Sequence, residues 1–142
     1  MSGARELARY GVVKVTTCSP GQLLIMLYDG LLRFLGEAQV ALESKDPAKA
    51  GARIGRSLAI LEQLLAGLNR EVLPSLCDKL APLYQFCITH ITTANLRQDP
   101  TKIADVIRIL SPLRDAWQTA VAQVASEAAA VAKSPSVAEA GV

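Results

Sequence analysis

The sequence has few of the residues that build β-sheet cores, disulfide frameworks and metal sites. Aromatic residues make up only 4% of the 142 residues, and there is one histidine. β-Sandwiches and barrels draw on aromatic and β-branched residues, so an all-β fold is disfavoured. Three cysteines, Cys18, Cys77 and Cys87, are odd in number and show no C-x-x-C or zinc spacing. We interpret them as small apolar residues in a reducing cytosol.

An excess of one charge and a long apolar run are also missing. The 15 Lys and Arg residues stand against 13 Asp and Glu, and the basic residues are spread along the chain. A nucleic-acid-binding protein would cluster them, so we expect no nucleic-acid partner. The longest apolar run, Leu23 to Tyr28, is far shorter than the ~20 residues that cross a bilayer. The start carries Arg5, Glu6 and Arg9 where a signal peptide needs an apolar core, which predicts a cytoplasmic protein without a membrane partner.

What remains is a chain that is 51% hydrophobic, rich in Ala and Leu, and of single-domain length. A capping residue followed by proline occurs at Ser19-Pro20, Asp46-Pro47 and Asp99-Pro100, which are helix starts. Apolar spacing predicts helices over residues 20–43, 47–69, 74–96 and from 100 to about 125. The predicted fold is all-α, an antiparallel up-and-down four-helix bundle over residues 19–125. An extended N-terminal segment, 1–18, precedes it, and a frayed or disordered tail, 126–142, follows.

Two prolines fall inside the predicted helices. Pro82 removes one backbone hydrogen bond and clashes with the carbonyl of Asp78, so we expect a kink there or a helix that effectively begins later. Pro112 is expected to bend the last helix about midway. The predicted inward stripe of the third helix consists of Leu76, Leu80, Leu83, Cys87, Ile91 and Ala94.

The sequence does not suggest an enzyme. A ferritin-like di-metal bundle needs two Glu-x-x-His pairs, but the residue three before His90 is Cys87. Cys87 and His90 lie one helical turn apart, yet Cys87 falls on the predicted buried stripe and no acid within sequence reach orients His90. We therefore predict no catalytic residue, no cofactor and no metal.

The first predicted helix is apolar on more than one face. A core-facing helix needs a stripe about 100° wide, and further apolar residues cover much of the remaining circumference. Either this helix is central in a larger core, or its second face binds a partner. Gly30 either allows close approach of another backbone or is a tolerated interior glycine. The core stripe is Leu24, Leu27, Leu31, Phe34, Ala38 and Leu42, and the additional residues are Leu23, Ile25, Met26, Tyr28, Leu32 and Leu35.

Several blocks resemble the flagellar secretion chaperone family FliS. The first comprises Tyr10, Val13 to Thr17, Ser19-Pro20, then Leu24 to Asp29 reading L-I-M-L-Y-D, with Gly30, Arg33 and Phe34. Later blocks are Leu83-Tyr84, Ala94-Asn95 with Asp99, and Leu113 to Trp117 reading L-R-D-A-W. The resemblance spans about Tyr10 to Gln118. Cys18, Pro82 and Pro112 depart from the family pattern.

The resemblance implies a cytoplasmic chaperone that binds the C-terminal segment of flagellin in apolar grooves. It would prevent premature polymerisation before flagellar type III secretion, with the stretch around Tyr10 to Val15 covering part of the groove in the free protein. A homodimer is left open, and the alternative is a self-associating structural or regulatory helical bundle without flagellin binding. The partner-binding residues expected are Tyr10, Val13, Ile25, Tyr28, Leu32, Tyr84, Asn95 and Trp117.

Some of these expected binding residues have another reading. An aromatic residue at helical spacing, such as Tyr84 or Trp117, also suits the bundle core. Asn95 could instead cap a helix end. Asp29 and Arg33, spaced i,i+4, predict a surface ion pair.

Overall fold

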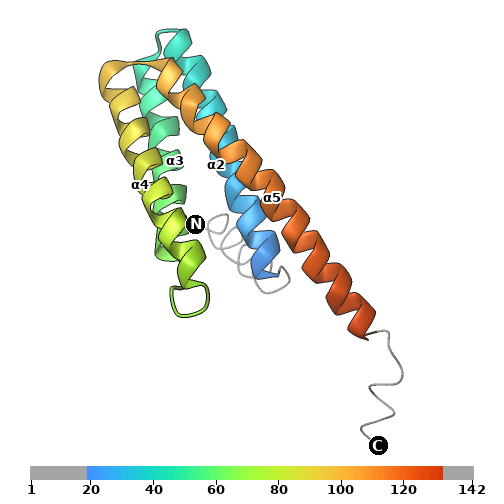
Figure 1. Ribbon diagram of the computed structural model, residues 1–142. Helices are drawn as coiled ribbons and strands as arrows, with labels where there is room; N and C mark the ends of the chain where they lie inside the picture. Colours follow the sequence, from blue (N-terminus) through green and yellow to red (C-terminus); the bar gives the residue numbers. More distant parts are fainter. Residues whose placement is uncertain (1–18, 133–142) are drawn as a thin grey trace, which may run out of the picture. The chain divides into compact units, whose positions relative to one another are not determined.

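The computed structural model describes residues 19–132, which form four successive α-helices (Figure 1). They are α2 (Pro20–Glu43), α3 (Pro47–Ala66), α4 (Pro74–Arg97) and α5 (Pro100–Ala132), and no strand occurs among the described residues. The predicted all-α four-helix class is confirmed. The expected N-terminal segment, including Tyr10 and Val13, and the last ten residues lie outside the described part of the chain.

The helix starts follow the capping residues read from the sequence. Ser19 and Gln22 form a reciprocal capping box: the backbone N–H of Gln22 donates to Ser19 Oγ at 3.1 Å, and the backbone N–H of Ser19 donates to Gln22 Oε1 at 3.3 Å. The Asp46 carboxylate accepts from the backbone N–H three residues later at 3.2 Å. Asp99 accepts from the N–H two residues later at 2.9 Å. These side chains satisfy N–H groups that have no intrahelical partner.

Two helix ends differ from expectation, and both prolines lie inside continuous helices. α3 stops at Ala66, before the predicted end at residue 69, whereas α5 continues to Ala132, beyond the predicted end near residue 125. The Ala-rich sequence of 125–132 has a high helix propensity, which explains this extension. α4 begins at Pro74 and continues through Pro82, so the alternative of a late start is wrong. α5 likewise continues through Pro112.

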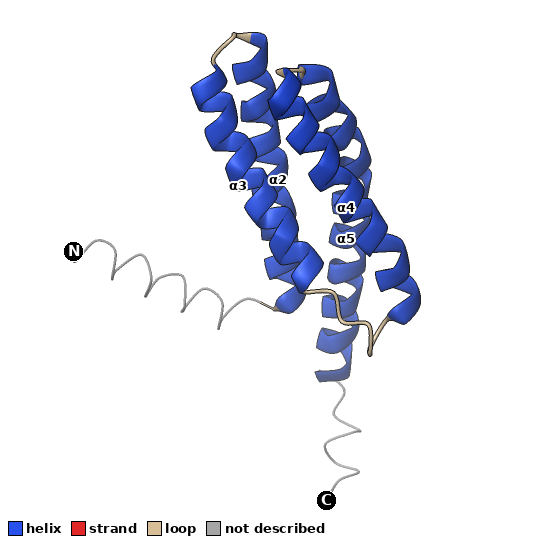
Figure 2. Ribbon diagram, turned by 90° about the vertical axis from the view of Figure 1, so that its left-hand side faces the viewer, coloured by secondary structure: helices blue, strands red, loops and turns tan. Residues whose placement is uncertain are grey.

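The described residues fall into two compact units. The larger, Met26–Arg114, contains α3, α4 and the adjoining parts of α2 and α5, joined by short connections in up-and-down order (Figure 2). The smaller contains residues 19–25 and 115–132, where a Cβ added at Gly21 would come within 2.8 Å of Val121 Cγ2. The first turn of α2 therefore lies against α5 in this smaller unit, so closely that a larger residue at Gly21 would require the Val121 side chain to move.

The predicted core stripes of two helices are confirmed in part, since Leu31, Ala38 and Leu42 on α2 and Leu80, Cys87, Ile91 and Ala94 on α4 are buried. On α4, Cys77 and Tyr84 are buried, while Leu76 and Leu83 are only half-buried. On α2 the buried face contains Tyr28 and Leu35, both predicted for the second face. Both helices offer more than one apolar stripe, and packing against neighbouring helices selects among them. The fully buried large side chains are Tyr28, Tyr84, Leu31, Leu35, Leu42, Ile54, Leu61, Ile91, Ile103, Leu110, Val106 and Cys87.

Candidate binding surface

Tyr28 and Tyr84 were expected in a partner groove, and the structure places both in the bundle core. They are 0% and 1% exposed, and their hydroxyl oxygens lie 2.5 Å apart. Burial, with the hydrogen bond to Tyr28 as a second cause, raises the pKa of the Tyr84 phenol well above its ordinary value. The pair thus joins α2 to α4 as two neutral hydroxyls. Contact of either residue with a partner stays a prediction.

The other expected binding residues within the described part are spread over the helices. Ile25 is 9% exposed, and Leu32 is half-buried on α2. Asn95 is half-buried, and its side-chain oxygen accepts from Gln98 Nε2 at 3.5 Å, beside the left-handed residue that ends α4. Trp117 is half-buried, and its buried indole Nε1 has no hydrogen-bond partner in residues 19–132. A direct hydrogen bond joins Tyr28 to Tyr84, and Asn95 bonds within its own helix end.

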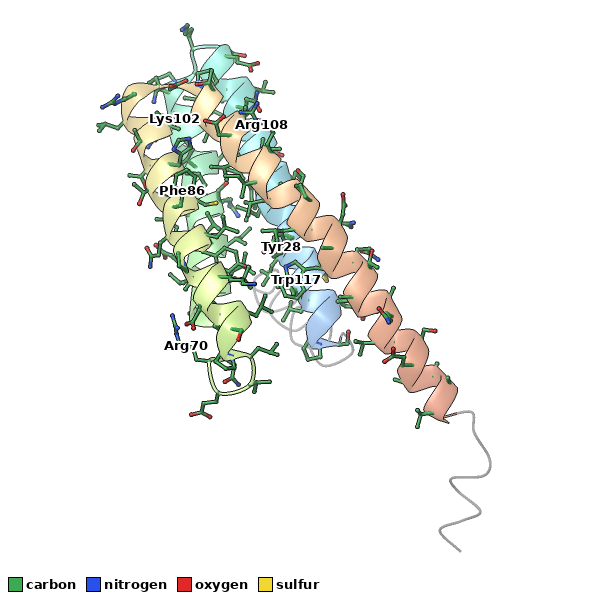
Figure 3. All side chains as sticks on the ribbon, in the orientation of Figure 1. Tyr28, Arg70, Phe86, Lys102, Arg108 and Trp117 are labelled. Carbon is green, nitrogen blue, oxygen red and sulfur yellow. The ribbon has the colours of Figure 1, made fainter. Side chains whose placement is uncertain are left out.

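Exposed and half-buried apolar side chains occur on α4 and α5 of the larger unit, beside a contact between the two helices. His90 Nε2 on α4 lies 3.0 Å from Asp105 Oδ2 on α5, and this contact joins the two helices. Phe86, one turn from His90, stacks on its imidazole with ring centroids 5.0 Å apart and remains 48% exposed (Figure 3). One turn beyond Asp105, Ile109 is half-buried, and Pro112 is exposed. We call Leu83, Phe86, Ile109 and Pro112 the α4–α5 seam.

Phe86 and Ile109 were not predicted as binding residues from the sequence, and Leu83 was predicted to face the core. Phe86 lies one position before Cys87, which is buried, so helical spacing places it outside the core stripe. A large aromatic residue at such a position is a signal that could have been read from the sequence. Exposed apolar surface of this kind marks binding sites when it is contiguous.

The polar end of the seam is held by charge-assisted hydrogen bonds. The Asp105 carboxylate accepts from His90 Nε2 and from Arg108 of its own helix. The His90 bond, followed by the Arg108 bond, lowers the pKa of the Asp105 carboxyl below its ordinary value. These contacts fix the ring on which Phe86 stacks.

The lowered pKa of Asp105 predicts an acid-sensitive contribution to stability. Because its pKa is lower in the folded state, the contribution is fully present above the unfolded pKa, about 3.9, and is lost as pH falls through the folded value. Urea denaturation from about pH 5 to pH 2 should therefore show a smaller loss of unfolding free energy for Asp105→Asn than for wild type. Parallel pH curves for the two proteins would contradict this assignment.

The predicted ion pair between Asp29 and Arg33 is wrong. Asp29 instead accepts two bonds from Arg114 of α5, from Nε at 2.7 Å and Nη2 at 3.2 Å. This bidentate geometry suits a guanidinium and a carboxylate better than a flexible i,i+4 pair does. The Arg33 side chain instead lies over the Phe34 ring, with its guanidinium carbon 5.0 Å from the ring centroid.

Two chemical features bear on the enzyme question. Cys87 is 0% exposed, and burial raises the pKa of its thiol to about 11, whereas a nucleophilic cysteine needs a lowered value. In residues 19–132, no group of three or more His, Cys, Asp or Glu side chains could hold a metal ion.

None of the four described helices combines the length and apolar character needed to span a bilayer.

The fold defines a small all-α bundle protein, and Phe86 is a large apolar side chain exposed on it. The family model described as flagellar protein FliS matches residues 3–124, so the chain belongs to the FliS family of flagellar secretion chaperones. Among its relatives is the flagellar secretion chaperone FliS of Salmonella typhimurium, 34% identical over 82% of this chain and 88% of that protein. The flagellar secretion chaperone FliS of Bacillus subtilis is 30% identical over 75% of this chain and 79% of its own length.

The fold of this chain also has a counterpart among solved structures. A crystal structure described as a flagellar chaperone from bacteria superposes with a TM-score of 0.70 and 20% sequence identity. The match covers 85% of this chain and 98% of that one. It supports the four-helix architecture independently of the sequence resemblance.

Proposed function

We propose that this protein is a cytoplasmic export chaperone for flagellin. It binds the C-terminal segment of flagellin as helices in apolar grooves and prevents polymerisation before flagellar type III secretion. The observation that carries the proposal is the α4–α5 seam, with Phe86 48% exposed, on a chain of the flagellar secretion chaperone family. Leu83, Phe86 and His90 are spaced i, i+3 and i+7, so they lie on one face of α4.

The energetics favour a partner that wraps around the bundle. One buried aliphatic or aromatic anchor contributes ~1.5–3 kcal/mol, whereas association and ordering of a flexible tail cost ~4–15 kcal/mol or more. Several anchors are therefore needed, and the larger unit exposes further apolar side chains away from the seam. They are Met26 at 39%, Val40 at 60%, Val72 at 66%, Leu73 at 55% and Leu96 at 82% exposed.

The N-terminal segment completes the proposal. Residues 1–18, which include Tyr10 and Val13, would cover part of the groove until the partner arrives. Deletion of residues 1–15 should then accelerate binding of the flagellin segment in stopped-flow measurements. Unchanged association kinetics would remove the covering role while leaving the chaperone function in place.

Isothermal titration with a peptide of the flagellin C-terminus from the same organism tests the proposal. We expect binding with a negative heat-capacity change, because apolar surface is buried. Phe86→Ser should weaken the affinity about tenfold or more, since one well-buried anchor is lost. Val40→Ser is the matched control, because Val40 is also a 60% exposed apolar residue on a helix.

The titration has two outcomes that contradict the proposal. Equal weakening by both variants would exclude the seam as the binding site. Absence of binding, together with a concentration-dependent dimer whose interface includes Ile25 and Leu32, would support the self-associating bundle instead. Sedimentation of the free protein distinguishes these results.

A further inference from the structure

A second surface, on α2 and α3, carries positive charge around one aromatic ring. The guanidinium carbons of Arg33 and Arg56 lie 5.0 and 5.7 Å from the centroid of the Phe34 ring. Arg53 is in the preceding turn of α3, and Lys49 is one turn before that. Together, Arg33, Lys49, Arg53 and Arg56 are called the basic cluster.

The carboxylates near the basic cluster are already engaged. Glu37 pairs with Arg53 at 2.6 Å. Asp29 is held by Arg114, and Asp46 accepts the capping bond at the start of α3. Within residues 19–132, neither Arg33 nor Arg56 has a carboxylate partner, and each contacts Phe34. The Asp46 carboxylate keeps its charge while it caps α3, so the four cations stand beside two carboxylates, those of Glu37 and Asp46, which leaves a local excess of positive charge.

Stacking on Phe34 orders the two guanidinium groups without using their hydrogen-bonding edges. A guanidinium contacts an aromatic ring through its face, so the N–H donors at its rim remain directed outward. Those donors match carboxylate oxygens in bidentate geometry. Both guanidinium groups lie against the same ring, so a segment that approaches one of them also approaches the other.

Two glycines without side chains lie beside residues of the basic cluster. Gly36 on α2 and Gly55 on α3 have no other atom within 4 Å of an added Cβ, so neither glycine is required by packing inside the chain. No side chain projects at these positions to block an approaching helix. This supports the charge argument without carrying it.

We propose that the basic cluster docks an acidic helical segment of a protein partner. The surface lies on α2 and α3, whereas the seam lies on α4 and α5, so this inference does not depend on the proposed function. Nucleic acid fits less well, because both guanidinium groups contact the Phe34 ring on which a base would stack. The net charge of the whole chain is also only +2.

The probe is a synthetic Ala-rich helical peptide with Glu pairs at i,i+4 along one face. A second peptide of the same composition has the Glu residues distributed around the helix. Fluorescence anisotropy with the full-length protein should show tighter binding of the paired peptide, weakening as salt increases. Arg33→Gln/Arg56→Gln should weaken this binding at least tenfold. The matched control is Lys79→Gln/Arg97→Gln, which removes two exposed positive charges from α4.

Each result decides the proposal. A tenfold loss in the arginine variant, with the control within twofold of wild type, supports it. Equal losses in both variants, equal affinity for the two peptides, or no binding overturn it. Self-association of the wild type that the arginine variant abolishes would assign the surface to a second copy of the chain and overturn the acidic segment. Thermal melts of both variants, which retain the aliphatic stems, verify that the bundle is folded.

Discussion

Replacing Leu35 by alanine is expected to lower the free energy of unfolding by about 2–5 kcal/mol. Leu35 lies on α2 with 0% of its surface exposed. Truncation removes buried methyl groups and leaves a cavity that close-packed neighbours fill only in part. Urea denaturation followed by circular dichroism at 222 nm measures the effect, and an unchanged m-value would show that the unfolded state is unaffected.

Val40→Ala is the control for this substitution on the same helix. Val40 is 60% exposed, so its truncation removes little buried area and should change the unfolding free energy by no more than about 0.5 kcal/mol. Comparable losses at residues 35 and 40 would mean that α2 does not face the core as described. The comparison therefore tests directly whether α2 buries Leu35 and exposes Val40.

Removing one hydroxyl of the buried tyrosine pair is expected to cost about 1–3 kcal/mol. Tyr28→Phe leaves the Tyr84 hydroxyl in the core without the hydrogen bond described here. Adding Tyr84→Phe removes the hydroxyl that has lost this hydrogen bond, so the double variant should be no less stable than Tyr28→Phe alone. Denaturation of the two single variants and the double variant forms a double-mutant cycle that isolates the coupling. Additive losses would contradict a direct hydrogen bond.

The same variants test the alkaline behaviour of the core. Burial raises the folded-state pKa of Tyr84, so its contribution is fully present below the unfolded pKa, about 10, and is lost as pH rises above that value. The Cys87 thiol, with a folded-state pKa of about 11, adds a loss of the same sign. The stability of the double phenylalanine variant should consequently decline less above pH 10 than that of wild type.

Local sequence signals predicted the helix starts because each start depends on neighbouring residues. Ser19 with Gln22, and Asp46 with the following proline, are complete within one helical turn. The face that each helix buries depends on distant residues instead. Tyr28 and Tyr84 are 56 positions apart, and α2 has apolar residues around most of its circumference, so its sequence alone permitted several core stripes.

The candidate site was harder to predict than the fold for a related reason. The partner of Asp29 is 85 positions away in Arg114, whereas sequence spacing pointed to Arg33. The spacing of Phe86 from Cys87 could have singled it out, but its stacking on His90, which contacts Asp105 of α5, depends on residues of another helix. Aromatic residues were assigned to a partner surface by resemblance, yet Tyr28 and Tyr84 are in the core. Distinguishing an interior aromatic residue from an exposed one required the packed helices.

The short connections of the larger unit bear on how quickly this protein becomes available. Helices that follow one another directly, with a connection of only residues 98–99 between α4 and α5, form mostly local contacts. Helical bundles of this kind fold in microseconds to milliseconds, whereas ribosomes extend a chain by about 5–20 residues per second. A newly released copy would therefore finish folding before a ribosome adds the next residue to a nascent partner.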